Sequence, residues 1–397
     1  MPSTGFPYRG PGGQEEVKLI GKCPHAEAVV GRMRIAIVSH APLSFSGGAE
    51  KWIREVSLAL TSRGHSVDVY TPADSRSSMI KPVEFGVREI PYRSRSLSLL
   101  RKLGLANFLP PFANPRLIMD YDVVYSASIY YVRLFLRRRG RLIVGTHDLF
   151  LPNRSVGVDL ADSVPLLLLK ILKSRPVKIH TLNPVTTLRL QRLGLRVFEA
   201  RNFLMRVPPI DEPPSHPGFR VLFVGRLEAR KGAELLAPLA EMISSEGKYE
   251  LLVAGRCPPS ARGLIGKLQA LPHVHYLGEV SNEKRDELYR TSDAFLLLSD
   301  RESFSFTAVE AMSWGLPVVS TWKHLYNVLG EPSIVLTEPS VHSIMSSLSD
   351  LAFRRDRDAI SYEKWRMEIV ARTRKKFCDP SLLTRVVDLF EEDEASR

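Results

Sequence analysis

Short apolar runs recur along the whole chain, and polar or helix-forming sequence separates each run from the next. Runs of this length that are rich in Val, Ile and Leu are typical of parallel strands buried on both faces. In the first half, they are Met33–Ser39, Val67–Thr71, Val123–Ser126, Leu142–Thr146 and Val177–Leu182. In the second half, they are Val221–Val224, Leu251–Ala254, Val274–Leu277, Ala294–Leu298 and Pro317–Ser320.

Helical patterns occupy several of the intervals. Glu50–Arg63 has an apolar stripe and is followed by Gly64, and Lys231–Ser244 and Asn282–Arg290 have similar stripes. Strands that alternate with helices along a chain indicate parallel sheets with right-handed crossover helices on their faces. The sequence therefore predicts an α/β fold.

A proline-rich segment divides the chain near its middle. Residues 207–217 contain five prolines, which are incompatible with a helix or a central strand, so we interpret the segment as a linker. We expect a tail at 1–32, doubly wound Rossmann-like domains at 33–206 and 218–378, and a C-terminal helix at 379–397 as a candidate to cross back to the first domain. A ligand is expected at the carboxyl ends of the strands, in the cleft between the domains.

Composition excludes several classes of protein. Apolar residues make up 44% and charged residues 25% of the 397 residues, which excludes a disordered chain. The three cysteines are scattered and form no CxxC pair, so we expect a reducing compartment and no disulfides. We expect no transmembrane helix, because no run of 18 apolar residues occurs, and no signal peptide, because the first 32 residues have no apolar stretch of useful length.

Charge is distributed unevenly between the two halves. Residues 1–210 hold 31 Lys and Arg against 15 Asp and Glu, a net charge of +16. Residues 211–397 hold 24 against 28, a net charge of −4. The first half is therefore expected to meet an anionic partner, with a basic soluble protein that has no such partner as the alternative.

In each half, a turn with a distinctive composition follows the first strand. The turn in the first half contains two glycines, and the turn in the second half contains two cations. Gly47 and Gly48 open a helix whose free N–H groups suit an anion, although the segment is neither a GxGxxG nor a P-loop motif. Arg226 and Lys231 flank the turn after Val224, where two cations can converge on one diphosphate. A plain helix cap and solvated cations are the alternatives.

A third motif contains two glutamates eight positions apart, Glu302 and Glu310. Carboxylates accept hydrogen bonds from vicinal hydroxyls such as those of a ribose or a hexose. The N–H groups of Ser303, Phe304 and Ser305 open the following helix and suit a phosphate. A surface helix with a capping glutamate is the alternative, but it leaves the apolar neighbours of Glu310 unexplained.

These motifs together resemble the retaining nucleotide-sugar glycosyltransferases with the two-domain GT-B fold, in particular glycosyltransferase family 4. The resemblance covers roughly residues 33–390 and is most specific in the Glu302/Glu310 segment. Its elements, in chain order, are Gly47–Glu50, His147-Asp148, Phe223–Leu227 with Lys231-Gly232, Tyr276–Gly278, and Glu302/Glu310 with Gly315–Val319.

The resemblance implies a role for each motif. The first domain becomes the acceptor domain and the second the nucleotide-sugar domain. Arg226 and Lys231 would hold the donor diphosphate and stabilise the charge on the leaving nucleotide, with Gly48 near the phosphates and the acceptor. The family often has glycine where Ser303 and Ser305 stand, which puts the identity of the donor in question.

The resemblance also implies three side chains that contact the nucleotide sugar. Glu310 would accept hydrogen bonds from the ribose, Glu302 would face the donor sugar, and His147 would contact the sugar hydroxyls. We expect no metal or other cofactor. Asp120-Tyr121-Asp122 has DxD spacing, but it precedes its strand and so lies at the wrong end of the sheet.

The segment Arg93–Leu105 carries Leu99, Leu100 and Leu103 on one helical face and basic residues away from it, which is typical of a helix on a membrane surface. Arg137–Arg139 and Arg141 add to the basic surface, and an amphipathic helix packed on its own sheet is the alternative. We expect a cytoplasmic protein with peripheral association at the inner face of the membrane, for which a lipid-linked acceptor is a candidate. No nucleic-acid partner is expected, because the basic segment lacks interleaved aromatic residues.

The sequence therefore predicts transfer of a hexose from a nucleotide diphosphate sugar to an acceptor hydroxyl with retention. A non-hydrolysing nucleotide-sugar epimerase is one alternative, and it would need acid–base carboxylates and histidines in the cleft. A non-catalytic lipid- or nucleic-acid-binding module is the other, and the presence of Arg226, Lys231 and Glu310 argues against it.

Overall fold

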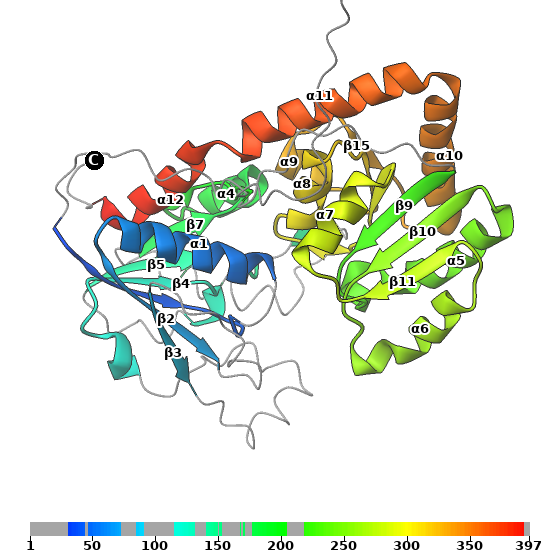
Figure 1. The fold of residues 1–397 in the computed structure, drawn as a ribbon. Coiled ribbons are helices and arrows are strands. Elements are labelled where there is room, and N and C mark those ends of the chain that lie inside the picture. Colours follow the sequence, from blue (N-terminus) through cyan, green and yellow to red (C-terminus); the bar gives the residue numbers. More distant parts are fainter. Residues whose placement is uncertain are drawn as a thin grey trace, which may run out of the picture.

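The computed structural model describes residues 31–43, 47–72, 85–90, 115–131, 140–149, 151–152, 167, 170, 177–204 and 218–392. It contains two α/β domains that lie side by side (Figure 1). The predicted linker at 207–217, the segment Arg93–Leu105, the cluster Arg137–Arg139 and nearly all of the tail at 1–32 lie outside the described residues.

The first domain contains a parallel sheet in the order β3-β2-β1-β4-β5-β7-β8. The apolar runs form the centre of this sheet, where β1, β4 and β5 are almost completely buried. The strands are β1 (Arg34–Val38), β2 (Ser66–Pro72), β3 (Gly86–Ile90), β4 (Val123–Ser126), β5 (Arg141–Gly145), β7 (Val177–Thr181) and β8 (Val197–Glu199). Helices α1 (Gly48–Ser62) and α4 (Pro184–Arg192) pack on it.

The second domain contains a parallel sheet in the order β11-β10-β9-β12-β14-β15. The strands are β9 (Phe219–Val224), β10 (Tyr249–Ala254), β11 (Val274–Gly278), β12 (Ala294–Leu297), β14 (Val318–Ser320) and β15 (Ile334–Leu336). The helices around it are α5 (Ala233–Glu246), α6 (Arg262–Gln269), α7 (Asn282–Arg290), α8 (Phe306–Ser313), α9 (Leu325–Leu329) and α10 (Val341–Arg357). The prediction of an α/β fold with two doubly wound domains is confirmed.

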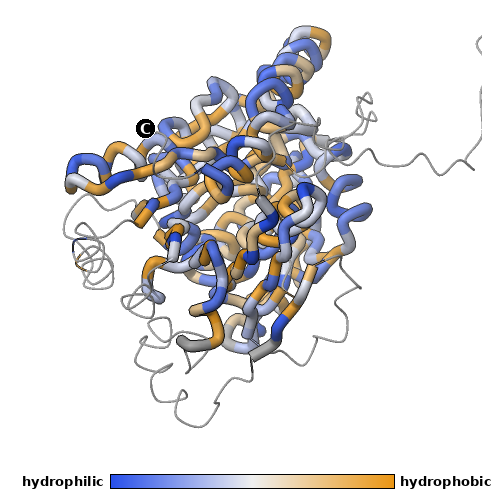
Figure 2. The backbone as a smooth tube through the Cα atoms, turned by 90° about the vertical axis from the view of Figure 1, so that its left-hand side faces the viewer, coloured by the Kyte–Doolittle hydropathy of each residue, from blue (hydrophilic) through white to orange (hydrophobic). Residues whose placement is uncertain are grey.

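Two long C-terminal helices run from the second domain to the first (Figure 1). Helix α11 (Ala359–Phe377) packs on α8, and α12 (Pro380–Glu391) packs on α1. Phe390 and its apolar neighbours in α12 belong to the core of the first domain. The colours along the outer helices in Figure 2 alternate between hydrophilic and hydrophobic, as expected for helices with one buried face.

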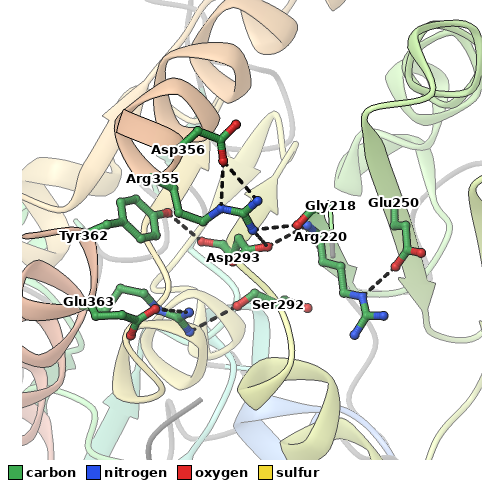
Figure 3. Close-up of polar contacts among 10 residues, drawn as sticks. Gly218, Arg220, Glu250, Ser292, Asp293, Arg355, Asp356, Tyr362 and Glu363 are labelled. Atoms are coloured by element: carbon green, nitrogen blue, oxygen red, sulfur yellow. Dashed lines mark hydrogen bonds and ion pairs between the residues drawn. The ribbon is translucent and has the colours of Figure 1, made fainter. Parts of the chain in front are cut away.

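A buried polar network holds α10 and α11 against the amino ends of β9 and β12 (Figure 3). The carboxylate of Asp293 accepts hydrogen bonds from the backbone N–H of Arg220 at 2.8 Å and from Arg355 Nη1 at 3.0 Å. Tyr362 donates to the carbonyl of Asp293 at 3.1 Å. Helices α10 and α11 are thus attached at the end of the sheet opposite to the carboxyl ends of the strands.

None of the helices in the described ranges is long and apolar enough to cross a membrane.

Candidate functional site

The carboxyl ends of the two sheets are joined by a small antiparallel pairing between the domains. Strand β6 (Leu151–Pro152) pairs with β13 (Arg301–Glu302), with Leu151 opposite Glu302. The indole N–H of Trp322 donates to the carbonyl of Leu151 at 2.7 Å. The segment after β5, which contains His147, is therefore held next to the segment that contains Glu302.

Lys231 and Glu302 form an ion pair at this junction. Glu302 is buried and also accepts a hydrogen bond from Ser299 Oγ at 2.7 Å, and Arg230 lies 3.9 Å from its other oxygen. Burial alone would raise the pKa of Glu302, but the charges of Lys231 and Arg230 outweigh it and hold the pKa below its ordinary value. Glu302 is therefore ionised at neutral pH.

Gly232 makes this pairing possible. Its φ of +80° is left-handed, and a Cβ atom there would lie 2.2 Å from the carbonyl oxygen of Leu298. Only glycine accepts that backbone conformation and that close approach without strain. The turn after β9 is thereby packed onto the chain that leads from β12 to Glu302, and Lys231 reaches the carboxylate.

Arg226 has a different partner from Lys231. Its Nη1 lies 3.0 Å from Glu228 Oε1, and its side chain is 53% exposed. Burial and the nearby charge of Arg226 lower the pKa of His40 to about 4, so Arg226 faces the end of β1 in the first domain. Each of the two cations is thus paired with its own glutamate.

Glu310 is already engaged by three groups. Its Oε1 lies 3.4 Å from Lys51 Nζ of α1, while its Oε2 accepts from the Tyr289 hydroxyl at 3.1 Å and lies 3.5 Å from Arg285 Nε. Lys51 belongs to the first domain, so this ion pair links the two domains. A ribose would therefore have to share or replace these contacts.

The segment between the two glutamates starts α8 in a strained conformation. Ser305 has a φ of +75°, which is unusual for a residue other than glycine. Its buried hydroxyl has no hydrogen-bond partner among the described residues. The carbonyl of Ser303 accepts from Asn183 Nδ2 of the first domain at 2.7 Å.

Phe304 lies in the core. Its ring packs against Phe306 and Phe377, with centroid separations of 5.2 and 5.9 Å. The ring is therefore part of the core, and the predicted donor-binding role of Phe304 concerns its backbone N–H group.

Gly48 lies where the two domains touch. A Cβ atom at this position would be 2.2 Å from Cδ2 of Phe306, at the start of α8. At the same end of α1, the carboxylate of Glu50 folds back over Gly47 and is buried. Burial raises the pKa of Glu50, although its own backbone N–H and Arg226 act in the opposite direction.

His147 is buried just beyond the end of β5. Its Nε2 lies 2.8 Å from the hydroxyl of Tyr125, and its ring packs edge-on against Trp52 with centroids 4.7 Å apart. The neighbouring Asp148 points elsewhere, accepting hydrogen bonds from Ser128 Oγ and from the N–H of Ile129. Burial raises the pKa of Asp148 to about 7 despite these bonds.

Sequence reasoning missed His40, Lys51, Asn183 and Tyr125, and it assigned no separate role to Glu50 of the glycine motif. The sequence did contain a signal for four of these residues. Lys51 and Glu50 lie in or next to the glycine motif at the start of α1, and His40 and Asn183 follow strand ends. The pattern could not indicate which residue each of them contacts.

The DxD-like segment has a structural role. Asp122 Oδ2 accepts from the N–H of Arg34 at 2.6 Å, and Tyr121 donates to Asp68 at 2.6 Å. These contacts lie at the amino ends of the strands. Across the described ranges, no three His, Cys, Asp or Glu side chains are grouped so that they could hold a metal ion.

Two family models match the chain, and each covers much of one domain. Residues 46–182 match the model for Glycosyltransferase Family 4, and residues 211–328 match the model for Glycosyl transferases group 1. Among curated proteins, the chain is similar to a human protein that forms part of phosphatidylinositol N-acetylglucosaminyltransferase, with 26% identity over 334 residues. That match covers 78% of this chain and 66% of the human protein.

Two solved structures share the fold at low sequence identity. Sucrose-phosphate synthase from Thermosynechococcus elongatus is 19% identical with a TM-score of 0.70, and the match covers 90% of this chain and 98% of that chain. Anabaena HepE, solved in complex with UDP and glucose, is 15% identical with a TM-score of 0.65, and the match covers 90% and 99%.

Proposed function

Because the chain is a glycosyltransferase with the GT-B fold that resembles family 4, we propose that it transfers a hexose from a nucleotide diphosphate sugar to an acceptor hydroxyl with retention of configuration. The observation that carries this proposal is the Lys231–Glu302 ion pair at the carboxyl ends of both parallel sheets. A largely buried cation and a buried carboxylate at the point where two Rossmann-like domains meet suit a ligand that has both an anionic and a hydroxylated part.

The proposed chemistry is charge stabilisation on the leaving nucleotide. Lys231 and Arg226 would bind the diphosphate, where cations fixed in a partly dry cleft lower the energy of the departing anion. The N-terminus of α8 supports the same charge through its backbone N–H groups. Glu310 would accept hydrogen bonds from the ribose, and Glu302 would accept hydrogen bonds from the donor sugar. Each carboxylate would first have to release a side chain with which it is now paired. No metal ion takes part in this proposal.

UDP is the proposed nucleotide of the donor, supported by the UDP bound in the structurally similar Anabaena protein. The test is thermal-shift screening of UDP-, GDP- and ADP-sugars, because a ligand that binds the folded state raises the melting temperature. A ligand at about a hundred times its Kd stabilises by about 2.7 kcal/mol, which such a screen resolves. A shift with GDP- or ADP-sugars alone would replace UDP in the proposal, and no shift with any of them would overturn the donor class.

A lipid-linked acceptor is the proposed second substrate. Two observations support it: the name of the human relative, and the net charge of +16 over residues 1–210, which suits an anionic membrane surface. The proposed location is the cytoplasmic face of a membrane, with peripheral association. Co-sedimentation with anionic and neutral liposomes at low and high salt tests it, with salt-sensitive binding to the anionic vesicles expected. No binding to anionic vesicles at low salt would favour a soluble acceptor instead.

A further inference from the structure

A buried chain of three polar side chains lies near the carboxyl ends of β4, β5 and β7 in the first domain. Tyr125 of β4 stands at its centre, with its hydroxyl 2.8 Å from His147 Nε2 and 2.8 Å from His180 Nδ1. His180 Nε2 lies 3.0 Å from the carbonyl oxygen of Ala200. Tyr125 and His180 are fully enclosed, while His147, just beyond the end of β5, keeps 7% of its surface exposed.

The directions of these hydrogen bonds follow from the last partner in the chain. A carbonyl oxygen only accepts, so His180 Nε2 carries the hydrogen and His180 Nδ1 has the lone pair. Tyr125 therefore donates to His180 Nδ1, and its oxygen is left to accept from His147 Nε2–H. It follows that His147 Nδ1 carries no hydrogen. Burial supports this assignment by lowering the pKa of His147 far below its ordinary value and that of His180 to about 4, so both rings are neutral.

Packing prevents the rings from rearranging. Trp52 contacts all three, with centroids 5.1 Å from Tyr125, 4.7 Å from His147 and 5.4 Å from His180. A Cβ atom at Gly145 would lie 2.1 Å from the Tyr125 hydroxyl, so glycine at this position of β5 leaves the space that the hydroxyl occupies.

We propose that Tyr125 and His180 are positioning residues that fix His147 in the tautomer with its hydrogen on Nε2, so that Nδ1 presents a lone pair to a hydroxyl of the donor sugar. The proposal rests on the proposed function, which supplies the sugar. Among the described residues, the ring of His147 bonds through Nε2, which leaves Nδ1 for a ligand. All hydrogen bonds would then run in one direction, from the sugar hydroxyl to the carbonyl of Ala200, and each polarises the next. A group that cannot donate a hydrogen would be rejected at this position.

The tautomer itself is measured without any substrate. Long-range ¹⁵N–¹H spectra of the full chain labelled at histidine distinguish the two ring nitrogens, and His147→Gln and His180→Gln assign the signals. We expect both rings to be neutral with hydrogen on Nε2 at pH 7.5. We expect Tyr125→Phe to give a mixture of tautomers at His147. A hydrogen on Nδ1 of His147, or a charged ring, in the wild type would overturn the proposal.

Substrate binding provides the second measurement, with UDP, UDP-glucose and UDP-N-acetylglucosamine as the probes. Tyr125→Phe should lower kcat/KM and affinity for the accepted UDP-sugar by roughly five- to thirtyfold, the range expected when one hydrogen bond is lost, and leave the affinity for UDP unchanged. A general loss of structure would weaken both ligands alike.

The matched control is Tyr70→Phe, which removes another buried hydroxyl of the same domain from the opposite side of the sheet. It should leave the ratio of UDP-sugar to UDP affinity unaltered. An unchanged ratio in Tyr125→Phe, or the same fall in Tyr70→Phe, would overturn the proposal. If the wild type binds none of the three probes, the proposed donor has failed, and the tautomer measurement still decides whether Tyr125 and His180 orient His147.

Discussion

Replacement of Lys231 by methionine separates the structural role of the Lys231–Glu302 pair from its proposed role in catalysis. The side chains of Lys231 and Glu302 are 20% and 6% exposed, so the variant leaves a buried carboxylate with Arg230 and Ser299 as its partners. Removal of one member of a buried ion pair destabilises by about 3–5 kcal/mol, and the remaining Arg230 argues for the lower end. At about 2–4 °C per kcal/mol for a domain of this size, the melting temperature should fall by roughly 6–12 °C.

The pH dependence of this loss has a defined sign. In the wild type, burial acts to raise the pKa of Glu302, but Lys231 and Arg230 lower it overall, so the pair stabilises above the ordinary carboxyl pKa and loses its contribution as pH falls through the lowered value. In Lys231→Met burial should dominate and raise that pKa. The folded variant then binds a proton more tightly than the unfolded chain, and its stability falls as pH rises above about 4.3. The gap in melting temperature should therefore widen from pH 4.5 to pH 7.5.

Scanning calorimetry at both pH values measures the effect, and Lys231→Met with Glu302→Gln is the control. A neutral amide needs no cation, so the double variant should recover most of the melting temperature at pH 7.5. Both variants should turn over the donor about a hundredfold more slowly, since neither has the lysine that the proposed function requires. The reasoning would be refuted if Lys231→Met had the same melting temperature as the wild type at pH 7.5. It would also be refuted if the double variant were no more stable than Lys231→Met.

Three further changes test the cleft. Glu310→Gln should weaken UDP binding in calorimetry by about 1.5–3 kcal/mol with the fold intact, and an unchanged affinity would make Glu310 purely structural. Gly48→Ala should force the domains apart, because its Cβ would meet Phe306, at an expense of about 1–3 kcal/mol. Its kcat/KM should fall and should recover when Phe306→Leu is added; full activity in Gly48→Ala would contradict the close contact. Ser305→Gly should raise the melting temperature by roughly 2–4 °C, as about 1 kcal/mol of backbone strain is relieved, and a lower melting temperature would mean that the hydroxyl is stabilising.

The central strands could be predicted because strands that are buried on both faces consist mostly of apolar residues. The strands expected at Val123–Ser126 and Val177–Leu182 are observed as β4 and β7 with almost unchanged bounds, and α7 is observed at the predicted Asn282–Arg290. The edge strands β3, β8 and β15 were missed. β8 and β15 have only three residues each, and β3 and β8 carry charged residues at the edge of the sheet, which weakens their apolar signal.

The positions of the site residues could be predicted, but their partners could not. Lys231 and Glu302 are 71 residues apart, and they meet because Gly232 packs the turn after β9 onto Leu298. Lys51 and Glu310 are 259 residues apart and belong to different domains. A local pattern indicates that a cation or a carboxylate lies at a strand end, whereas pairing depends on how the two sheets face each other.

The ion pairs between the cations and glutamates of the site follow from the partial burial of their side chains. An isolated charge in a partly buried place is strongly disfavoured, so each cation there needs an anion. Lys231 pairs with Glu302, and Lys51 pairs with Glu310. In the proposed function a diphosphate supplies the anionic charge, so the same carboxylates hold the positions of the donor before it binds and become acceptors for its hydroxyls afterwards. A sequence motif indicates which part of a ligand each of these residues would bind, whereas the fold determines which of the residues bind each other.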